Sequence, residues 1–270
     1  DEGLSGLELI ADLGPAASFA EGDLAELRGT FLGLGAELGV DLAVQRDDIF
    51  RRNKRLVCMD VDSTFVKGEF IDELAGLAGV KDRVSEITAR AMRGELDFKS
   101  ALAARVALLE GLKFADARAL AQKFELTPGA ERFVRILKSL GYHVGLVSGG
   151  FDSFVHDLKN RFGLDFAFSN ELEVKDGVIT GRVQGTVVDG ERKAQVLKDM
   201  AKIYKVRLEQ TVAIGHGAND MLMLKIAGLG IAFRAKPPLQ KVAHMSLNHH
   251  ESLDTLLFLM GFHQRDLKSI

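Results

Sequence analysis

The chain has 270 residues, of which 47% are hydrophobic and 27% charged, so it can bury a sizeable core and is not a disordered chain. Its 35 basic and 38 acidic residues give a net charge of -3, which excludes a general electrostatic attraction to nucleic acid or anionic membranes. A single cysteine excludes an intrachain disulfide, and no apolar run is long enough to span a bilayer. We expect a cytoplasmic protein of one or two domains.

The first 45 residues form a segment unlike the rest of the chain. A helical pattern covers residues 22–38, and residues 40–45 could form a strand. A segment of this length is too short to build a core of its own. Because the chain begins with Asp1 rather than Met, we interpret residues 1–45 as the remnant of an N-terminal domain.

Short β-rich runs alternate with helical patterns over most of the chain beyond this segment. Strands are predicted at residues 55–60, 144–148, 211–215 and 229–233, and a β-hairpin with an Asp-Gly turn at 172–179. The alternation predicts the α/β class, with a Rossmann-like parallel sheet covered by helices on both faces. Ligands of such sheets bind beyond the carboxyl ends of the strands, where Asp60, Ser148 and His216 stand.

One region breaks the alternation because its patterns are helical only. The predicted helices are at 71–78, 82–92, 98–109 and 115–124. An all-helical insert after the first strand predicts a small cap over the active edge of the sheet. The expected division is therefore a core of residues 46–67 and 128–270, and a cap of residues 68–127.

Polar residues follow the first two predicted strands. Two carboxylates, Asp60 and Asp62, can divide the work of a reaction, one attacking as a nucleophile and the other transferring a proton. The simpler interpretation is a turn, because Asp and Ser are common turn formers. Ser148 and Gly149 begin a Ser-Gly-Gly sequence that lets backbone N–H groups approach an anion, with a strand-to-helix turn as the simpler interpretation.

Two further elements lie toward the C-terminus. Lys193 stands near the start of a predicted helix, against the helix dipole, which contact with a phosphate would explain; a solvated surface lysine is the alternative. After the third strand, His216 and Asp220 could hold a metal and Asn219 could orient a ligand. The alternative there is a glycine turn followed by a helix start.

In this order, the motifs resemble those of the phosphoserine phosphatases of the haloacid dehalogenase (HAD) superfamily. The resemblance runs from about Gln45 to Gly261. The motifs that carry it are Asp60-Val61-Asp62-Ser63-Thr64, Gly68-Glu69-Phe70-Ile71-Asp72-Glu73-Leu74-Ala75, Ala91-Met92-Arg93-Gly94, Arg105-Val106 with Leu108-Leu109, Ser148-Gly149-Gly150-Phe151, Lys193-Ala194, Gly217-Ala218-Asn219-Asp220 and Ala235-Lys236-Pro237. It implies a HAD-like core with a helical cap, and residues 45–48 resemble the end of the ACT-like domain of longer members.

The resemblance implies a reaction and a set of residue roles. The reaction is hydrolysis of O-phospho-L-serine to L-serine and phosphate through an aspartyl-phosphate, the last step of serine biosynthesis. Asp60 would be the nucleophile, and Asp62 would protonate the leaving oxygen and then activate water. The phosphate would be bound by Ser148, Gly149, Lys193 and Asn219. Glu69 would meet the amino group of the substrate and Arg105 its carboxylate, although a helix start and a surface ion pair are the simpler interpretations.

The resemblance also implies a magnesium ion, held by Asp60, by the backbone carbonyl of Asp62 and by the fourth motif. The family pattern has an Asp where His216 stands. Magnesium prefers oxygen ligands, whereas imidazole suits zinc, iron or nickel. We therefore predict weakened magnesium binding and reduced turnover with magnesium, with Asp220 retained as a ligand.

Three interpretations of His216 stay open: a substitution that traps substrate, a natural change toward another metal, and a loss of catalysis that leaves a phosphoserine-binding or regulatory protein. A phosphatase for another small phosphomonoester is a further alternative. The expected partner is the small-molecule substrate, without nucleic acid or membrane, and a homodimer is left open.

Overall fold

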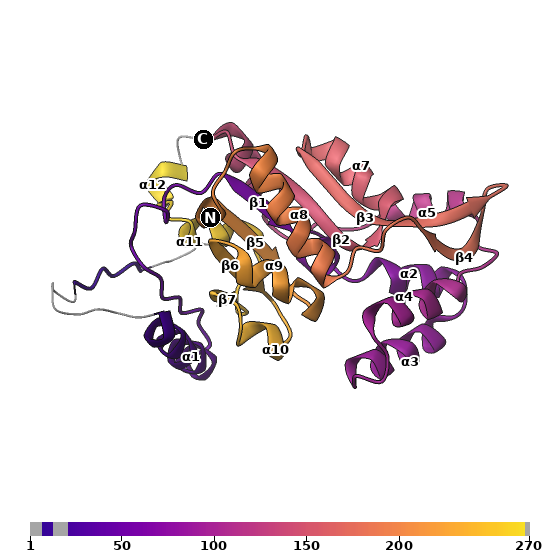
Figure 1. Cartoon of the computed structure of the whole chain (residues 1–270), viewed down its shortest axis with the longest axis horizontal. Coiled ribbons are helices and arrows are strands. Elements are labelled where there is room, and N and C mark those ends of the chain that lie inside the picture. Colours follow the sequence, from indigo (N-terminus) through magenta and orange to yellow (C-terminus); the bar gives the residue numbers. More distant parts are fainter. Residues whose placement is uncertain (1–6, 13–20, 268–270) are drawn as a thin grey trace.

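The computed structural model describes residues 7–12 and 21–267. Part of the predicted remnant at 1–45, and the last three residues of the predicted core, 268–270, lie outside the described residues. A seven-stranded sheet in the order β4-β3-β2-β1-β5-β6-β7 runs through the molecule (Figure 1). All neighbouring strands are parallel except β3 and β4. The strands are β1 (Leu56–Met59), β2 (His143–Phe151), β3 (Phe166–Lys175), β4 (Val178–Gln184), β5 (Thr211–Gly215), β6 (Leu229–Phe233) and β7 (Met245–Leu247).

The central strands are uninterrupted apolar runs because helices cover both faces of the sheet. Every residue of β1, β5 and β6 is buried. Successive residues of β1 point to opposite faces, so that Val57 packs in one apolar cluster and Leu56 in the other. The first cluster lies beneath α6 (Ala130–Ser139) and α7 (Asp152–Phe162), and the second beneath α8 (Gly190–Ile203) and α9 (Met221–Ile226).

Four helices between β1 and α6 make up what we call the insert. They are α2 (Phe70–Leu77), α3 (Lys81–Met92), α4 (Phe98–Ala107) and α5 (Phe114–Ala121). Three of them form a lobe beside the sheet in Figure 1, and the fourth, α5, also contacts α7. The outgoing and returning chains lie side by side, because Val66 pairs with Leu126 in an antiparallel bridge. Thr127 strengthens this junction, since its N–H donates to Phe65 O at 3.0 Å and its hydroxyl to Thr64 O at 2.7 Å.

The predicted strand at 40–45 is wrong. This segment follows α1 (Glu21–Leu38) without joining any described strand. Its polar groups serve the C-terminal part of the chain instead: the Asp41 carboxylate accepts hydrogen bonds from the N–H groups of Asn248, His249 and His250. Gln45 likewise donates to the carbonyl of Leu259 at 2.8 Å. The segment is therefore held in place by side-chain hydrogen bonds and not by strand pairing. Such bonds require no alternation of apolar and polar residues in the sequence.

The predicted hairpin is confirmed, with Asp176 and Gly177 at φ values of 52° and 77° between β3 and β4. Positive φ at both central residues is typical of the tight turns that join antiparallel strands. Among the described residues, no helix combines the length and the apolar character needed to cross a membrane. The short helices α10 (Pro237–Gln240), α11 (Leu256–Leu259) and α12 (Gln264–Leu267) complete the C-terminal part.

Candidate active site

Buried polar side chains converge where β1, β2 and β5 end. Asp60 follows β1, Ser148 lies near the end of β2, and His216 follows β5. Lys193 comes from the first turn of α8 and is completely buried, as is Asp220 beyond the β5 turn. Because β1 lies between β2 and β5, their carboxyl ends bring these groups to one place, as the sequence predicted.

Lys193 lies at the centre of this cluster. Its Nζ donates to Asp60 Oδ1 at 2.6 Å and to Asp220 Oδ1 at 2.7 Å. Burial works against the ionised form of Asp60, but the charge of Lys193 and the hydrogen bond from His216 outweigh it and lower the pKa of Asp60 to about 2. Asp60 is therefore an ionised carboxylate in a buried site, as a nucleophile must be.

His216 bridges two carboxylates that belong to different parts of the molecule. Its Nδ1 lies 2.9 Å from Asp60 Oδ2, and its Nε2 lies 3.0 Å from Glu69 Oε1 at the start of α2. Burial opposes a charge on the imidazole, but the hydrogen bonds to Asp60 and Glu69 outweigh burial and raise the pKa of His216 to about 10. A protonated His216 thus ties the strand ends to the insert.

Asp62 has surroundings different from those of Asp60. Its Oδ1 accepts the N–H of Phe70 at 2.7 Å, and its Oδ2 accepts the hydroxyl of Ser148 at 3.3 Å. Burial, followed by the negative charges of Glu69 and Asp60, raises the pKa of Asp62 to about 7. A carboxyl group whose pKa is near neutrality can both give and take a proton, which suits a general acid and base.

The Ser-Gly-Gly sequence leaves little room for side chains. A Cβ at Gly149 would lie 3.1 Å from the Phe98 ring and 3.2 Å from Asn219 Nδ2. The hydroxyl of Ser148 also accepts the N–H of Gly150 at 2.8 Å, which fixes the loop beside Asp62. Gly149 and Asn219 both line the cleft in front of the strand ends, and their contact with a phosphate stays a prediction.

Ligand atoms of Asp60, His216 and Asp220 lie within 4.8 Å of one another and are buried. Two carboxylates and an imidazole can bind a divalent cation, so the residues fit a metal, but they are not the all-oxygen set that magnesium prefers. Asp220 is also held by the chain, since its Oδ2 accepts the N–H groups of His216 and Gly217 at 3.0 Å each. That the backbone carbonyl of Asp62 binds metal stays a prediction.

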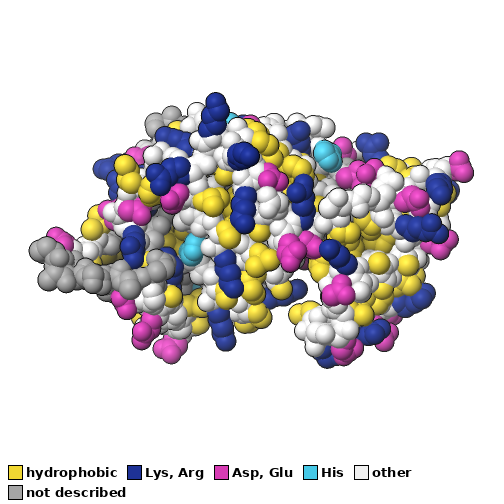
Figure 2. Space-filling view, in the orientation of Figure 1, with side chains coloured by type: hydrophobic (Ala, Val, Ile, Leu, Met, Phe, Trp, Pro, Cys, Tyr) yellow, Lys and Arg dark blue, Asp and Glu magenta, His cyan; other side chains and the backbone are white. Residues whose placement is uncertain are grey.

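A cleft of about 790 Å³ lies between the insert and the strand ends, where Figure 2 shows the surface to be notched. Asp60, Asp62 and His216 line its floor, and Arg105 of α4 lines the insert wall. Lys99 Nζ lies 3.0 Å from Asp189 Oδ2 and joins the insert to the start of α8. The predicted residues Glu69 and Arg105 therefore face the same cleft as the predicted catalytic pair.

Sequence reasoning missed two residues of the insert wall, Asp72 and Thr88, and the contact between His216 and Glu69. Asp72 was detectable, because it is an acid in the first turn of the helix predicted at 71–78, three residues after Glu69. The contact of His216 was not detectable, because it depends on how α2 meets the end of β5.

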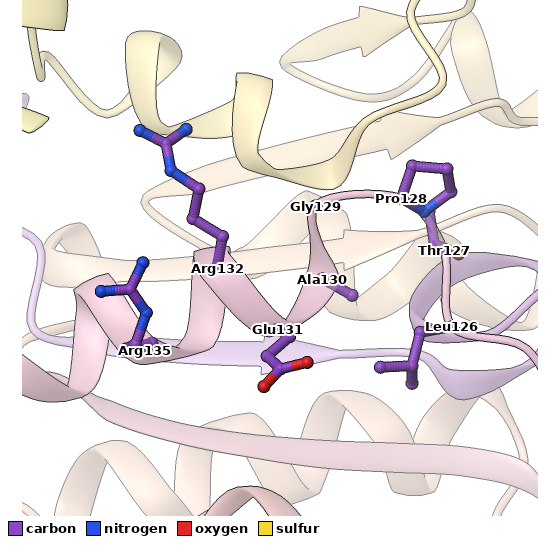
Figure 3. Close-up of a pocket in the computed structure, with 8 residues that line it drawn as sticks. All are labelled: Leu126, Thr127, Pro128, Gly129, Ala130, Glu131, Arg132 and Arg135. Carbon is purple, nitrogen blue, oxygen red and sulfur yellow. The ribbon is translucent and has the colours of Figure 1, made fainter.

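A second cavity, of about 530 Å³, lies where the insert returns to the core. Figure 3 shows Glu131 and Arg132 pointing to opposite sides of α6 at this cavity. Arg132 donates to Asp254 at 2.6 Å, so its charge is already paired. None of the predicted site residues lines this cavity.

Comparisons with known proteins agree on one family. A family model described as haloacid dehalogenase-like hydrolase matches residues 54–228. The phosphoserine phosphatase of Streptomyces coelicolor is 50% identical over 87% of this chain and 57% of its own length. SerB2 of Mycobacterium tuberculosis, also a phosphoserine phosphatase, is 46% identical over 100% of this chain and 64% of its own length. The chain thus spans about three-fifths of the length of these two relatives.

A shorter relative and two solved structures are covered almost completely. The phosphoserine phosphatase of Methanocaldococcus jannaschii is 44% identical over 77% of this chain and 99% of its own length. A structure described as a phospho-aspartyl intermediate analogue of phosphoserine phosphatase has a TM-score of 0.72 at 45% identity, covering 76% of this chain and 98% of that one. A substrate-bound phosphoserine phosphatase complex has a TM-score of 0.72 at 44% identity, covering 76% and 97%.

Proposed function

Because the chain belongs to the haloacid dehalogenase-like hydrolases and, within them, to the phosphoserine phosphatases, we propose that it hydrolyses O-phospho-L-serine to L-serine and phosphate. The predicted family and fold are confirmed. The observation that carries the proposal is the pair Asp60 and Asp62, one held ionised and the other with a pKa near 7 in the same buried cleft. The last step of serine biosynthesis, a cytoplasmic location and a homodimer stay predictions.

The proposed reaction has two displacements at phosphorus. In the first, a carboxylate oxygen of Asp60 bonds to phosphorus, the bond from phosphorus to the serine oxygen breaks, and Asp62 gives its proton to that oxygen. In the second, Asp62 takes a proton from water, the water oxygen bonds to phosphorus, and the bond to Asp60 breaks. Lys193 and Ser148, which already contact these two carboxylates, would hold the phosphoryl oxygens and balance their charge.

We propose that Asp60, His216 and Asp220 hold a divalent metal, which when bound neutralises negative charge on the phosphate. The imidazole favours an ion such as zinc, iron or nickel over magnesium. To bind the metal, His216 would have to release the proton of Nδ1 and give up its contact with Asp60. The strength of that contact, at 2.9 Å, supports weak magnesium binding.

The proposed domain division is a core of residues 46–67 and 128–270 with a cap of residues 68–127. The side-by-side junction at Val66 and Leu126 supports it. The assignment of residues 1–45 to an ACT-like remnant also stays a proposal.

A second candidate function is phosphoserine binding without turnover. The observation that favours it is the pair of contacts by which His216 occupies both Asp60 and Glu69. A chain whose nucleophile stays tied to His216 would bind the substrate and leave its phosphate in place.

One experiment distinguishes hydrolysis from binding without turnover. It measures phosphate release from L-phosphoserine with magnesium, manganese and zinc, for the chain and for His216→Asp. We expect release by the chain with at least one ion, and a rise with magnesium in His216→Asp. Asp60→Asn gives the zero level, since it lacks the nucleophile. Equal magnesium rates in the chain and in His216→Asp would contradict our interpretation of the metal site. Tight phosphoserine binding with no release under any ion would establish the second candidate instead.

A further inference from the structure

Glu69 already has partners in this chain. Its Oε1 accepts the hydroxyl of Ser63 at 2.8 Å and lies 3.0 Å from Nε2 of His216. A substrate ammonium group that approached Glu69 would therefore compete with the imidazole that already contacts it.

Asp72 lies one turn further along α2 and lines the same cleft. It is half-buried, and within the described ranges its carboxylate makes no hydrogen bond or ion pair. The charged groups that act on it are Glu69, Arg105, Lys81 and Glu73. Asp72 is thus a partly desolvated acceptor whose positive neighbour is the arginine expected to bind the substrate carboxylate.

Thr88 of α3 offers an unpartnered hydroxyl on this wall. Its Oγ1 is buried and has no hydrogen-bond partner among the described residues, although it lines the cleft with Asp72 and Arg105. Buried hydroxyl groups are normally hydrogen-bonded, so an unpaired one at a cleft is suited to a ligand. The wall therefore presents an acceptor, a donor cation and a hydroxyl, which match the two charges of an amino acid.

We propose that Asp72 is the main acceptor of the substrate's ammonium group in this chain, because His216 holds Glu69, and that the Thr88 hydroxyl supports it. This assignment rests on the proposed function. It makes Asp72 within α2, rather than Glu69 at the start of that helix, the determinant of amino-group recognition.

The test compares L-phosphoserine with its deamino analogue, 3-phosphooxypropanoate, which keeps the phosphate and the carboxylate. Asp72→Asn should lower kcat/KM for L-phosphoserine about 10- to 100-fold, the range for a lost hydrogen bond to a charged group. The same change should move kcat/KM for the analogue less than about twofold. Glu86→Gln, an exposed acid on α3 that does not line the cleft, is the matched control and should move neither.

Equal losses on both substrates, or no loss on either, would overturn the assignment of Asp72. Thr88→Val should also lower kcat/KM for L-phosphoserine, by less than Asp72→Asn does. Thr88→Ser, which keeps the hydroxyl, should have kcat/KM close to that of the parent chain. In a His216→Asp background Glu69 is released, so Asp72→Asn should cost less there than in the parent chain. An unchanged cost would also contradict the assignment.

Binding separates the assignment from the proposed function. Calorimetry on Asp60→Asn, which cannot form the phosphoenzyme, measures L-phosphoserine affinity without turnover. Adding Asp72→Asn should weaken the affinity for L-phosphoserine and leave that for the analogue unchanged. If Asp60→Asn binds L-phosphoserine and Asp72→Asn does not weaken it, only the assignment fails. If neither the chain nor Asp60→Asn binds L-phosphoserine with any of the three ions, the proposed function fails.

Discussion

At the strand ends the charges of Lys193, Asp60 and Asp220 are joined by ion pairs of 2.6 and 2.7 Å in a fully buried network, whereas on the insert wall Asp72 and Arg105 form no ion pair among the described residues. The first arrangement is preorganised, so its dipoles need not reorient when charge moves during a reaction. The second keeps its charges available for a ligand that supplies both signs. The strand-end side of the cleft thus holds its charges fixed, and the insert side leaves its charges available to bind a ligand.

The largest effect of a substitution is expected at Lys193, in the strand-end network. Replacing it, as Lys193→Met, leaves two buried carboxylates without their cation, and we expect a loss of about 3 to 5 kcal/mol in the free energy of unfolding. Urea unfolding measures this loss. Lys198→Met, an exposed lysine on the same helix, should stay within about 0.5 kcal/mol of the parent. Equal stability of the two variants would show that the charges of the strand-end network are not tightly coupled.

The insert wall should respond in recognition and not in stability. Arg105→Lys keeps the charge but loses the paired hydrogen bonds to a carboxylate, so kcat/KM for L-phosphoserine should fall about 10- to 100-fold, mainly through KM. Phosphoethanolamine, which lacks the carboxylate, should be hydrolysed equally by parent and variant. Arg83→Lys, exposed on α3, is the control. A matching loss on phosphoethanolamine would assign Arg105 a structural role.

Lys54 offers a buried charge of a third kind, whose partner is a backbone carbonyl. Its Nζ donates to Glu209 O at 2.7 Å, and burial lowers its pKa to about 8 from an ordinary 10.5. Between these pH values the unfolded chain binds a proton that the folded chain has released, so this group makes the free energy of unfolding rise with pH across that window. The difference between the parent and Lys54→Met, followed by urea unfolding from about pH 7.5 to about pH 10.5, should rise accordingly. A flat difference would contradict the buried position of the ammonium group.

The smallest effect is expected where the two sides of the cleft meet. Lys99 is 64% exposed at its ion pair with Asp189, so Lys99→Gln should change kcat/KM less than about fivefold. The change should shrink further as ionic strength rises, because exposed pairs are screened. An effect that persists in high salt would indicate that this pair controls closure of the cleft by packing rather than by charge.

The sequence predicted the elements that repeat a simple pattern. Strands β1, β2, β5 and β6 were recognisable as apolar runs, and the rule that ligands bind at strand ends then placed Asp60, Ser148 and His216 together. β7 has only three residues, and residues 40–45 are held by the side-chain hydrogen bonds of Asp41. Neither region therefore shows a periodic pattern of apolar residues from which its structure could be predicted. Contacts between elements that are far apart in the sequence could not be predicted, and the contact between His216 and Glu69 is one of them.

The junction at Val66 and Leu126 has a consequence for how this molecule can be altered. Two chains that leave and return side by side accept a replacement of whatever they carry, since their spacing is set by their own bridge and by Thr127. The helices of the insert can therefore be exchanged as one unit, provided that the new unit keeps an N–H for Asp62 and a carboxylate for His216, the contacts that Phe70 and Glu69 make with the strand ends.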